Sequence, residues 1–259
     1  PPQMSFRREK ILELKERFFQ EYPEDDASCW LVTDTTIFDP AAIRQYLQGV
    51  TKGRQESELV TVWKDVLGGR TYVIGIDVAA GVARGDFSVA SVLDVRTNEY
   101  VARIRGRLPP DIFAPEVLRM GQRYNDALLA VERTGHGNTV LHVLLEKNYP
   151  NIYYHVDYDV FKKVNVSEPG WKTSVRTKPM MIDDMAAAIR AGDIMIWSEN
   201  FFAEASALSM EGQKLYCPPG CHDDEVDALM IALQVREQTP IIGSSKSGVH
   251  TVTRYAPSL

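Results

Sequence analysis

The stretch GRTYVIGIDVAAGVARGDFSVASVLDVRTNEYVARIRGR, residues 69–107, decides the fold. It contains three runs rich in apolar and β-branched residues, TYVIGIDVA, DFSVASVLDV and YVARIRGR, which predict three consecutive strands. The segment Thr97-Asn98-Glu99 has the composition of a turn, so the second and third runs are expected to pair as a hairpin. Three antiparallel strands therefore open the predicted sheet.

Helices and strands alternate after this block. Pro109 and Pro110 end it, a helix is expected around residues 114–124, and the apolar run ALLAVE at 127–132 predicts a buried strand. The remaining expected elements are a strand at 152–156, a helix at 177–191 closed by Gly192, a helix near 200–210, a short hairpin around Gly212 and a last helix from residue 223. This order predicts an α/β fold whose mixed central sheet is flanked by helices.

The two ends of the chain differ from this core. Residues 4–20 place Ile11, Leu14 and Phe18 at helical spacing, and Asp39-Pro40 marks the start of a short helix over AAIRQYL. Residues 238–259 contain Pro, Ser and Gly without periodicity. We therefore expect a lead-in over residues 1–66, a main domain over 67–237 and a tail over 238–259.

The composition is that of an ordinary globular protein. The chain has 259 residues, 44% hydrophobic and 25% charged, and no run approaches 18 uncharged apolar residues, so no membrane segment is expected. Three cysteines, Cys29, Cys217 and Cys221, are too few for a disulfide framework and are typical of a cytosolic protein. Because the net charge is −6, a nucleic-acid partner would require local basic patches.

Two carboxylates occupy unusual positions in the predicted strands. Asp77 lies within an apolar strand, and Glu132 ends the buried run ALLAVE, although a buried carboxylate costs several kcal/mol unless it is partnered. Both would lie at strand ends, where open α/β sheets keep their ligand crevice. The structural alternatives are a turn role for Asp77 and a pairing of Glu132 with Arg133.

A third acidic group opens the last helix. Asp223, Asp224 and Asp227 share one side of this helix, next to the apolar stripe that is expected to face the core. The alternative for Asp223 or Asp224 is a helix N-cap. Together the carboxylates would repel one another unless a cation is bound. Hard divalent cations prefer oxygen ligands, and two of them about 3.5 to 4 Å apart activate a water and stabilise a departing phosphate oxygen.

Basic residues near these acids indicate a surface for DNA. Arginines alternate along the third strand, and a region expected to be rich in loops carries several lysines and Trp171. Such sets favour phosphate contacts. The predicted DNA-binding residues are Arg103, Arg105, Lys172, Arg176 and Lys178. For the arginine strand, a solvated face is the alternative.

The segment before the last helix offers a weaker metal signal. Cys217, Cys221 and His222 have spacing compatible with zinc, but no fourth ligand lies nearby in the sequence. His222 stands beside the acids, where it would position a water or support a metal ligand. The alternative is an ordinary surface histidine.

Four segments in order resemble the nuclease domain of bacteriophage large terminase subunits, the DNA-packaging motor proteins of the ribonuclease H-like superfamily. They are GIDVAAGVARGDFSVASVLD, YNDALLAVERTGHG, GWKTSVRTKPMMID and HDDEVDALMIAL, and the resemblance covers roughly residues 70–236. Residues 17–39 resemble the stretch where the ATPase domain of that family hands over to the nuclease. The ATPase itself requires a GxxxxGK[ST] loop, which this sequence lacks.

The resemblance implies a ribonuclease H-like fold and metal-dependent endonucleolytic cutting of double-stranded DNA. It implies catalytic roles for Asp77, Glu132, Asp224 and Asp223, with Asp227 as a further metal ligand or a residue that positions a water. It also implies two ions of Mg²⁺ or Mn²⁺, and as partners the ATPase domain of the same polypeptide, the portal and the small terminase subunit, in the cytoplasm of the infected host cell. The alternatives are a resolvase-like, site-specific nuclease of the superfamily and a non-catalytic DNA-docking module.

Overall fold

The computed structural model describes residues 36–133, 135–159, 163–211, 214–218, 220–236 and 239. The helices are α3 (Pro40–Leu47), α4 (Pro110–Arg123), α5 (Gly137–Glu146), α6 (Thr177–Ala191), α7 (Glu199–Ala207) and α8 (Asp224–Arg236). The strands are β1 (Arg54–Gln55), β2 (Val60–Val62), β3 (Tyr72–Asp77), β4 (Ser88–Asp94), β5 (Glu99–Gly106), β6 (Leu128–Val131), β7 (Tyr154–Asp159), β8 (Val164–Pro169), β9 (Ser209–Glu211) and β10 (Lys214–Tyr216).

The central sheet confirms the predicted fold class. It has six strands in the order β1-β2-β5-β4-β3-β6. Neighbouring strands are antiparallel except β3 and β6, which run parallel with Ile76 opposite Val131. The predicted hairpin is β4–β5, and Asn98 in its turn has the positive φ of 56° that asparagine tolerates. The result is a mixed sheet opened by three antiparallel strands.

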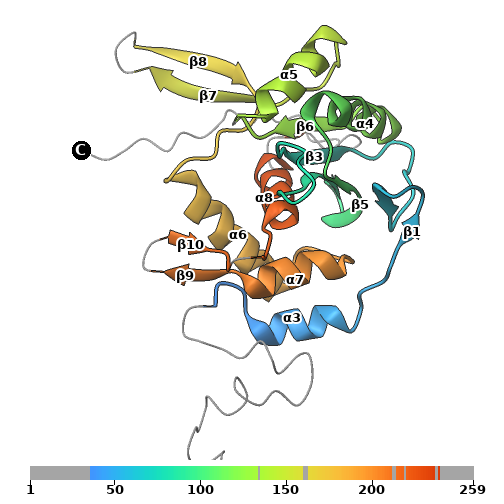
Figure 1. Cartoon of the computed structure of the whole chain (residues 1–259), viewed down its shortest axis with the longest axis vertical. Coiled ribbons are helices and arrows are strands. Elements are labelled where there is room, and N and C mark those ends of the chain that lie inside the picture. The colour runs from blue at the N-terminus through green and yellow to red at the C-terminus, as the bar shows by residue number, and fades with distance from the viewer. Residues whose placement is uncertain are drawn as a thin grey trace, which may run out of the picture.

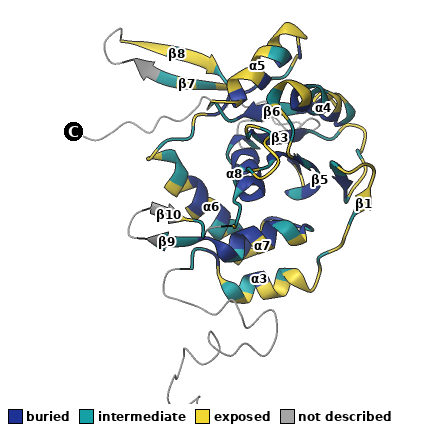
Figure 2. Ribbon diagram, in the orientation of Figure 1, coloured by how far each residue is buried: buried dark blue, intermediate teal, exposed yellow. Residues whose placement is uncertain are grey.

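Helices cover both faces of this sheet (Figure 1). On one face, α8 packs against β3, β4 and β6, and α6 and α7 pack against α8. On the other face, buried residues of α4 and α5 such as Phe113 and Leu141 join the core with Ile74 and Val131. Figure 2 shows α8 buried along most of its length between these layers. Its lack of an exposed face explains why its start lies inside the molecule.

Elements that precede residue 67 also join the central sheet and the core. Strands β1 and β2 extend the sheet next to β5, and Phe38 and Ile43, at and beside α3, pack in the same core as α8. The polar segment 49–58 was expected to be part of a lead-in. Strands of two and three residues are too short to carry a readable hydrophobic period, so the sequence does not indicate them.

The strand expected at 152–156 does not continue in the central sheet. Ile152 makes an isolated parallel bridge to Leu129, after which β7 pairs with β8 in a separate two-stranded sheet (Figure 1). The region before residue 178 was expected to be rich in loops, and β8 was not predicted. No residue of β8 is fully buried, so its sequence VNVSEP gives no apolar signal.

Other predicted elements are found close to their expected bounds. Helix α4 begins four residues earlier than expected because Pro110 takes its first position, which proline favours. Helix α6 ends at Gly192 in the left-handed conformation. The expected helix at 4–20, Cys29 and the tail at 238–259, apart from Thr239, lie outside the described residues. Of the helices described, none has the length and apolarity to cross a membrane.

Candidate active site

The parallel pairing of β3 and β6 brings Asp77 and Glu132 to the same edge of the sheet. The Glu132 backbone N–H donates to the carbonyl of Ile76 at 2.8 Å, directly beside Asp77. Val73 and Ala130 pack on the α8 face, and side chains alternate along a strand. Asp77 and Glu132, each an even number of residues further on, therefore point toward α8.

The two carboxyl groups interact in the metal-free protein. Burial, followed by the negative charges of Asp227 and Glu132, raises the pKa of Asp77 well above its usual range. A hydrogen bond to the Glu132 side chain raises the pKa of Asp77 further. Such a bond needs a proton between the two groups. The structure thus brings together the two strand-end acids that the sequence singled out.

Gly75 lets the acidic helix approach these strand ends. A Cβ on Gly75 would lie 1.9 Å from the Ala228 carbonyl oxygen and 2.5 Å from the Ala232 nitrogen. Helix α8 therefore lies directly on β3, on the face to which Asp77 points. Asp227 and Asp224 precede Ala228 by one and four residues, so they lie near the end of β3. Their negative charges accordingly contribute to the raised pKa of Asp77.

Asp227 is paired with Lys178 of α6. The Lys178 ammonium donates to both carboxylate oxygens of Asp227, and both side chains are largely buried. Burial raises the pKa of Asp227 to about 7, although the charge of Lys178 lowers it. Burial lowers the pKa of Lys178, but Asp227 and neighbouring acids outweigh it, and the net pKa is raised. The lysine thus supplies a positive charge inside the acidic cluster.

Asp224 is fixed by a loop between β3 and β4. Its Oδ2 accepts a hydrogen bond from the backbone N–H of Phe87 at 2.9 Å. Burial raises the pKa of Asp224 to about 6, and nearby acids such as Asp86 add to the effect. His222 Nδ1 lies 3.3 Å from Asp86 Oδ1 and 3.6 Å from Asp224 Oδ2. Asp86 is a neighbour of the site that the sequence did not indicate.

Asp223 lies half-buried immediately before α8. Its charge raises the pKa of Asp227 and of Lys178, which places it within electrostatic range of both. The N–H groups that an N-cap side chain would bind belong to the second and third residues of α8, and Glu204 of α7 accepts from both. Neither Asp223 nor Asp224 is therefore needed as the cap.

The carboxylates suit a hard divalent cation, which requires several oxygen ligands. Over the part of the chain that is described, the one trio of ligand atoms that all lie within 4.8 Å of one another is Asp86, His222 and Asp224. Asp77, Glu132 and Asp227 converge from other elements without forming such a trio. These oxygen ligands suit a divalent ion, and Lys178 is the cation that pairs with Asp227.

The zinc site considered at Cys217, Cys221 and His222 finds no support among the described residues. Neither Cys217 nor Cys221 belongs to the trio formed around His222. Burial, followed by the charge of Asp223, raises the pKa of Cys217 to about 11, which keeps the thiol protonated at neutral pH. Thiols bind zinc as thiolates.

The five residues predicted to bind DNA fall into two groups. Arg103 pairs with Glu225, and Arg105 lies 3.2 Å from Glu204, so both guanidinium groups are committed to largely buried ion pairs. The other three lie on the segment that follows Trp171, whose backbone pairs with that of Glu132. On this segment are Lys178, held by Asp227, exposed Arg176, and exposed Lys172, which lies 2.7 Å from Asp157.

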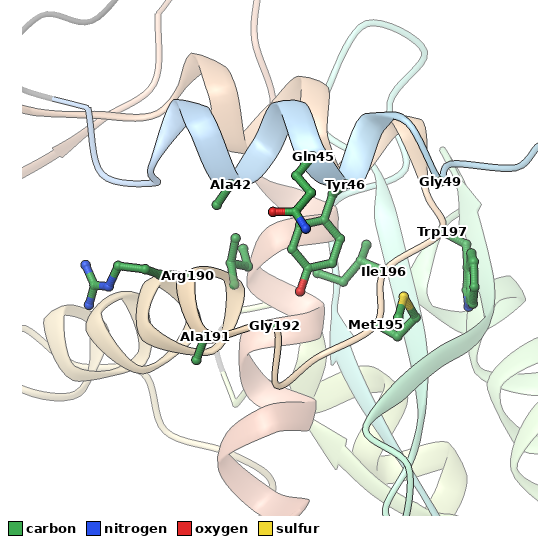
Figure 3. A pocket seen from close by; sticks show the side chains of 11 residues that line it. Ala42, Gln45, Tyr46, Gly49, Arg190, Ala191, Gly192, Met195, Ile196 and Trp197 are labelled. Atoms are coloured by element: carbon green, nitrogen blue, oxygen red, sulfur yellow. The ribbon is translucent and has the colours of Figure 1, made fainter.

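A cavity of about 370 Å³ lies elsewhere, between α3 and the segment that follows α6 (Figure 3). The hydroxyl of Tyr46, which lines it, donates to the carbonyl of Ile194 at 2.5 Å. None of the predicted acids lines this cavity. The candidate active site is instead the carboxylate cluster at the ends of β3 and β6.

Solved structures share this fold. The large terminase nuclease from thermophilic phage G20c aligns with a TM-score of 0.59 at 16% identity, over 77% of this chain and 98% of that chain. Its magnesium-bound form aligns with a TM-score of 0.61 at 15% identity, over 78% and 98%. The large terminase nuclease domain of Thermus phage P74-26 gives 0.59 at 16% identity, over 75% and 94%.

A search of curated protein sequences found no match. Residues 74–235, however, match the family described as the terminase RNaseH-like domain. This match spans β3 to α8 and includes every predicted acidic residue of the site. The chain therefore belongs to the family of terminase ribonuclease H-like domains.

Proposed function

We propose that this chain is a metal-dependent endonuclease that hydrolyses phosphodiester bonds of double-stranded viral DNA during genome packaging. The observation that carries the proposal is the meeting of Asp77 and Glu132, from adjacent parallel strands, with the acidic start of α8. Family membership supports a nuclease role in phage DNA packaging. The proposed catalytic domain is residues 67–237, whose sheet the lead-in extends through β1 and β2, and the tail follows it.

The proposed cofactors are two ions of Mg²⁺ or Mn²⁺. The proposed ligands are Asp77, Glu132 and Asp224, with Asp223 and Asp227 as further ligands. The G20c nuclease has been solved with bound magnesium and with bound cobalt, which supports a divalent ion in this fold. When bound, such ions lower the pKa of a water and stabilise the charge on a departing phosphate oxygen.

Several side chains of the site would support metal binding and water activation. Asp77 and Glu132 would hold the ion, whose positive charge would favour the ionised form of Asp77 against the burial and neighbouring acids that raise its pKa. Lys178 offsets the charge of Asp227. A divalent ion would take over this role and leave the lysine available to a DNA phosphate. His222, hydrogen-bonded to Asp86, is placed to orient a water beside Asp224.

The proposed DNA path runs over the segment that carries Lys172, Arg176 and Lys178. This segment leads from the end of β6 toward α6 and therefore borders the acids. Because the chain has a net charge of −6, DNA affinity depends on these local cations. The proposed partners are the ATPase domain of the same polypeptide, the portal and the small terminase subunit, in the cytoplasm of the infected host.

Plasmid cleavage tests the proposal. Supercoiled plasmid incubated with the chain and Mg²⁺ or Mn²⁺ is expected to be nicked and then linearised, and EDTA is expected to stop the reaction. Cleavage without preferred sites is expected, because phosphate contacts carry no sequence information. DNA binding without cleavage in either metal would favour the docking module, and a discrete ladder of fragments would favour a site-specific nuclease.

A further inference from the structure

The start of α8 is held by a carboxylate from another helix. Glu204 of α7 is 6% exposed, and its Oε2 accepts from the backbone N–H of Glu225 at 2.8 Å and of Val226 at 3.3 Å. The N–H groups of the first helical turn have no partner within the helix, and a local N-cap side chain usually binds them. Glu204 takes that part from outside the helix and caps α8.

Glu204 is itself anchored to the sheet. Arg105 of β5 donates from Nη2 to Glu204 Oε1 at 3.2 Å, and its guanidinium lies 3.5 Å from the ring centre of Phe87. The backbone N–H of Phe87 in turn donates to Asp224. A closed set of contacts thus runs from Asp224 through Phe87, Arg105 and Glu204 to the backbone of α8. It fixes the carboxylate of Asp224 from the loop side and from the helix side.

Glu225 adds a second anchor at the same point. Its side chain is fully buried and accepts from Tyr100 at 3.2 Å and from Arg103, both of which lie on β5. Glu225 therefore faces the sheet while its neighbour Asp224 faces the loop. The position of the first turn of α8 is set by side chains that belong to β5 and α7.

We propose that Glu204 is a positioning residue, whose carboxylate holds the N-terminus of α8 so that Asp224 and Asp227 lie where they bind the divalent ion. This inference rests on the proposed metal site. Residues that orient metal ligands typically change metal affinity by about 10- to 100-fold when they are altered. The contacts of Glu204 described above are to Arg105 and to the backbone of α8. Its effect on the metal ligands is therefore transmitted through the backbone of α8.

Two substitutions separate the position of the side-chain oxygen of residue 204 from its negative charge. Glu204→Gln keeps an oxygen at the same reach to accept from the N–H groups of α8, but removes the charge. Glu204→Asp keeps the charge but withdraws the carboxylate by one methylene. If position matters, Glu204→Asp is the more harmful variant. If Glu204 acts only by attracting the cation, Glu204→Gln is the more harmful variant, and a purely structural role moves the melting temperature alone.

Mn²⁺ affinity measured by electron paramagnetic resonance, without DNA, is the readout. Glu204→Asp is expected to weaken Mn²⁺ binding by about 10-fold or more, and Glu204→Gln is expected to retain most of the wild-type affinity. The matched controls are Glu199→Asp and Glu199→Gln, because Glu199 is an exposed residue of the same helix. Circular dichroism confirms that each variant is folded before binding is measured.

Three results would overturn the inference. They are equal Mn²⁺ affinity in all variants, a greater loss for Glu204→Gln than for Glu204→Asp, and a wild-type chain that binds no Mn²⁺. Plasmid cleavage is measured separately. If the wild type binds Mn²⁺ with the expected pattern among variants but cuts no DNA, the positioning role stands and the proposed nuclease function fails.

Discussion

At the scale of single residues, Asp77 is a carboxylate in an environment that disfavours its negative charge. Burial, followed by the negative charges of three other acids, raises the pKa of its carboxyl group well above the usual range. Such a carboxylate lowers the stability of the folded protein when it is ionised. A bound cation would offset its charge. The proposed metal site accounts for the presence of this carboxylate in an otherwise apolar strand.

We expect Asp77→Asn to abolish cleavage without unfolding the chain. The rate of plasmid nicking should fall by at least about 10³-fold, since a group that holds charge-stabilising ions in the transition state is removed. In EDTA at pH 8 the variant should melt at a higher temperature than the wild type, because a buried repelling charge is removed. The control is Asp183→Asn, an exposed aspartate of α6, which should change neither quantity. Normal Mn²⁺-dependent nicking by Asp77→Asn would show that the wrong acid was chosen.

The sequence indicated these acids better than it indicated their supports. Asp77 and Glu132 stand out because each interrupts an apolar run. Asp86 and Glu204 do not, because each acquires its partners only when distant segments meet. The contact between Arg105 and Glu204 joins residues 99 positions apart, and no local pattern records it.

At the scale of secondary-structure elements, the contact between β3 and α8 positions the site. Gly75 is the point of closest approach, because any side chain there would meet the backbone of Ala228 and Ala232. The acids at the end of β3 and the start of α8 depend on this contact for their spacing. The sequence predicted β3 and α8 as an apolar strand and an apolar helix. Their close approach depends on the missing side chain of Gly75.

Gly75→Ala should displace α8 and weaken metal binding. The added methyl group cannot fit without backbone movement, so we expect a loss of about 1–3 kcal/mol in the free energy of unfolding and weaker Mn²⁺ binding. Gly68→Ala is the matched control, because nothing lies within 4 Å of a Cβ at that glycine. Chemical denaturation and Mn²⁺ titration measure the two effects. A Gly75→Ala variant with wild-type stability would mean that α8 does not lie so close to β3.

The segment between β8 and α6 should bind the DNA backbone. Replacement of Lys172 and Arg176 by Ala should weaken binding to a DNA duplex and reduce the slope of log affinity against log salt by about 1 for each phosphate that is no longer neutralised. Arg119→Ala on α4, which packs against the opposite face of the sheet, should leave the slope unchanged. Fluorescence anisotropy at several salt concentrations provides the slope. An unchanged slope in the double variant would place the DNA elsewhere.

Strands β1, β2 and β8 show the limit of prediction at this scale. The strands β3, β4 and β5 were predicted because each is largely buried and apolar. In contrast, β1 is exposed and β8 has no fully buried residue, and both are held mainly by backbone pairing. Backbone hydrogen bonds do not depend on side-chain type, so such strands leave little trace in the sequence.

At the scale of the whole molecule, buried acids determine how stability depends on pH. Burial raises the pKa of Asp224 to about 6, and of Asp227 and Glu204 to about 7. The corresponding groups titrate near pH 4 in the unfolded chain. Between these values the folded state binds more protons than the unfolded state, so stability falls as the pH rises.

The metal-free protein should therefore be more stable at pH 5 than at pH 7.5. We expect a difference of at least about 2 kcal/mol in EDTA, because each pKa unit corresponds to about 1.4 kcal/mol. Exposed Glu56, whose pKa Arg123 and Arg54 lower to about 2, acts in the opposite sense only below about pH 4.5. Denaturant titrations across the pH range, with and without Mn²⁺, measure the effect. Metal should flatten the dependence, and a metal-free protein that gains stability over this range would contradict the account.

In the proposed site, Asp77 and Glu132 hold a divalent ion together with the start of α8. The most direct test is a crystal of the chain soaked in Mn²⁺, with anomalous diffraction recorded at the manganese edge. An anomalous peak is expected within roughly 2.0–2.3 Å of carboxylate oxygens from Asp77, Glu132 and Asp224. No peak at this position, or a peak held by Asp86 and His222 without Asp77, would contradict the proposed site.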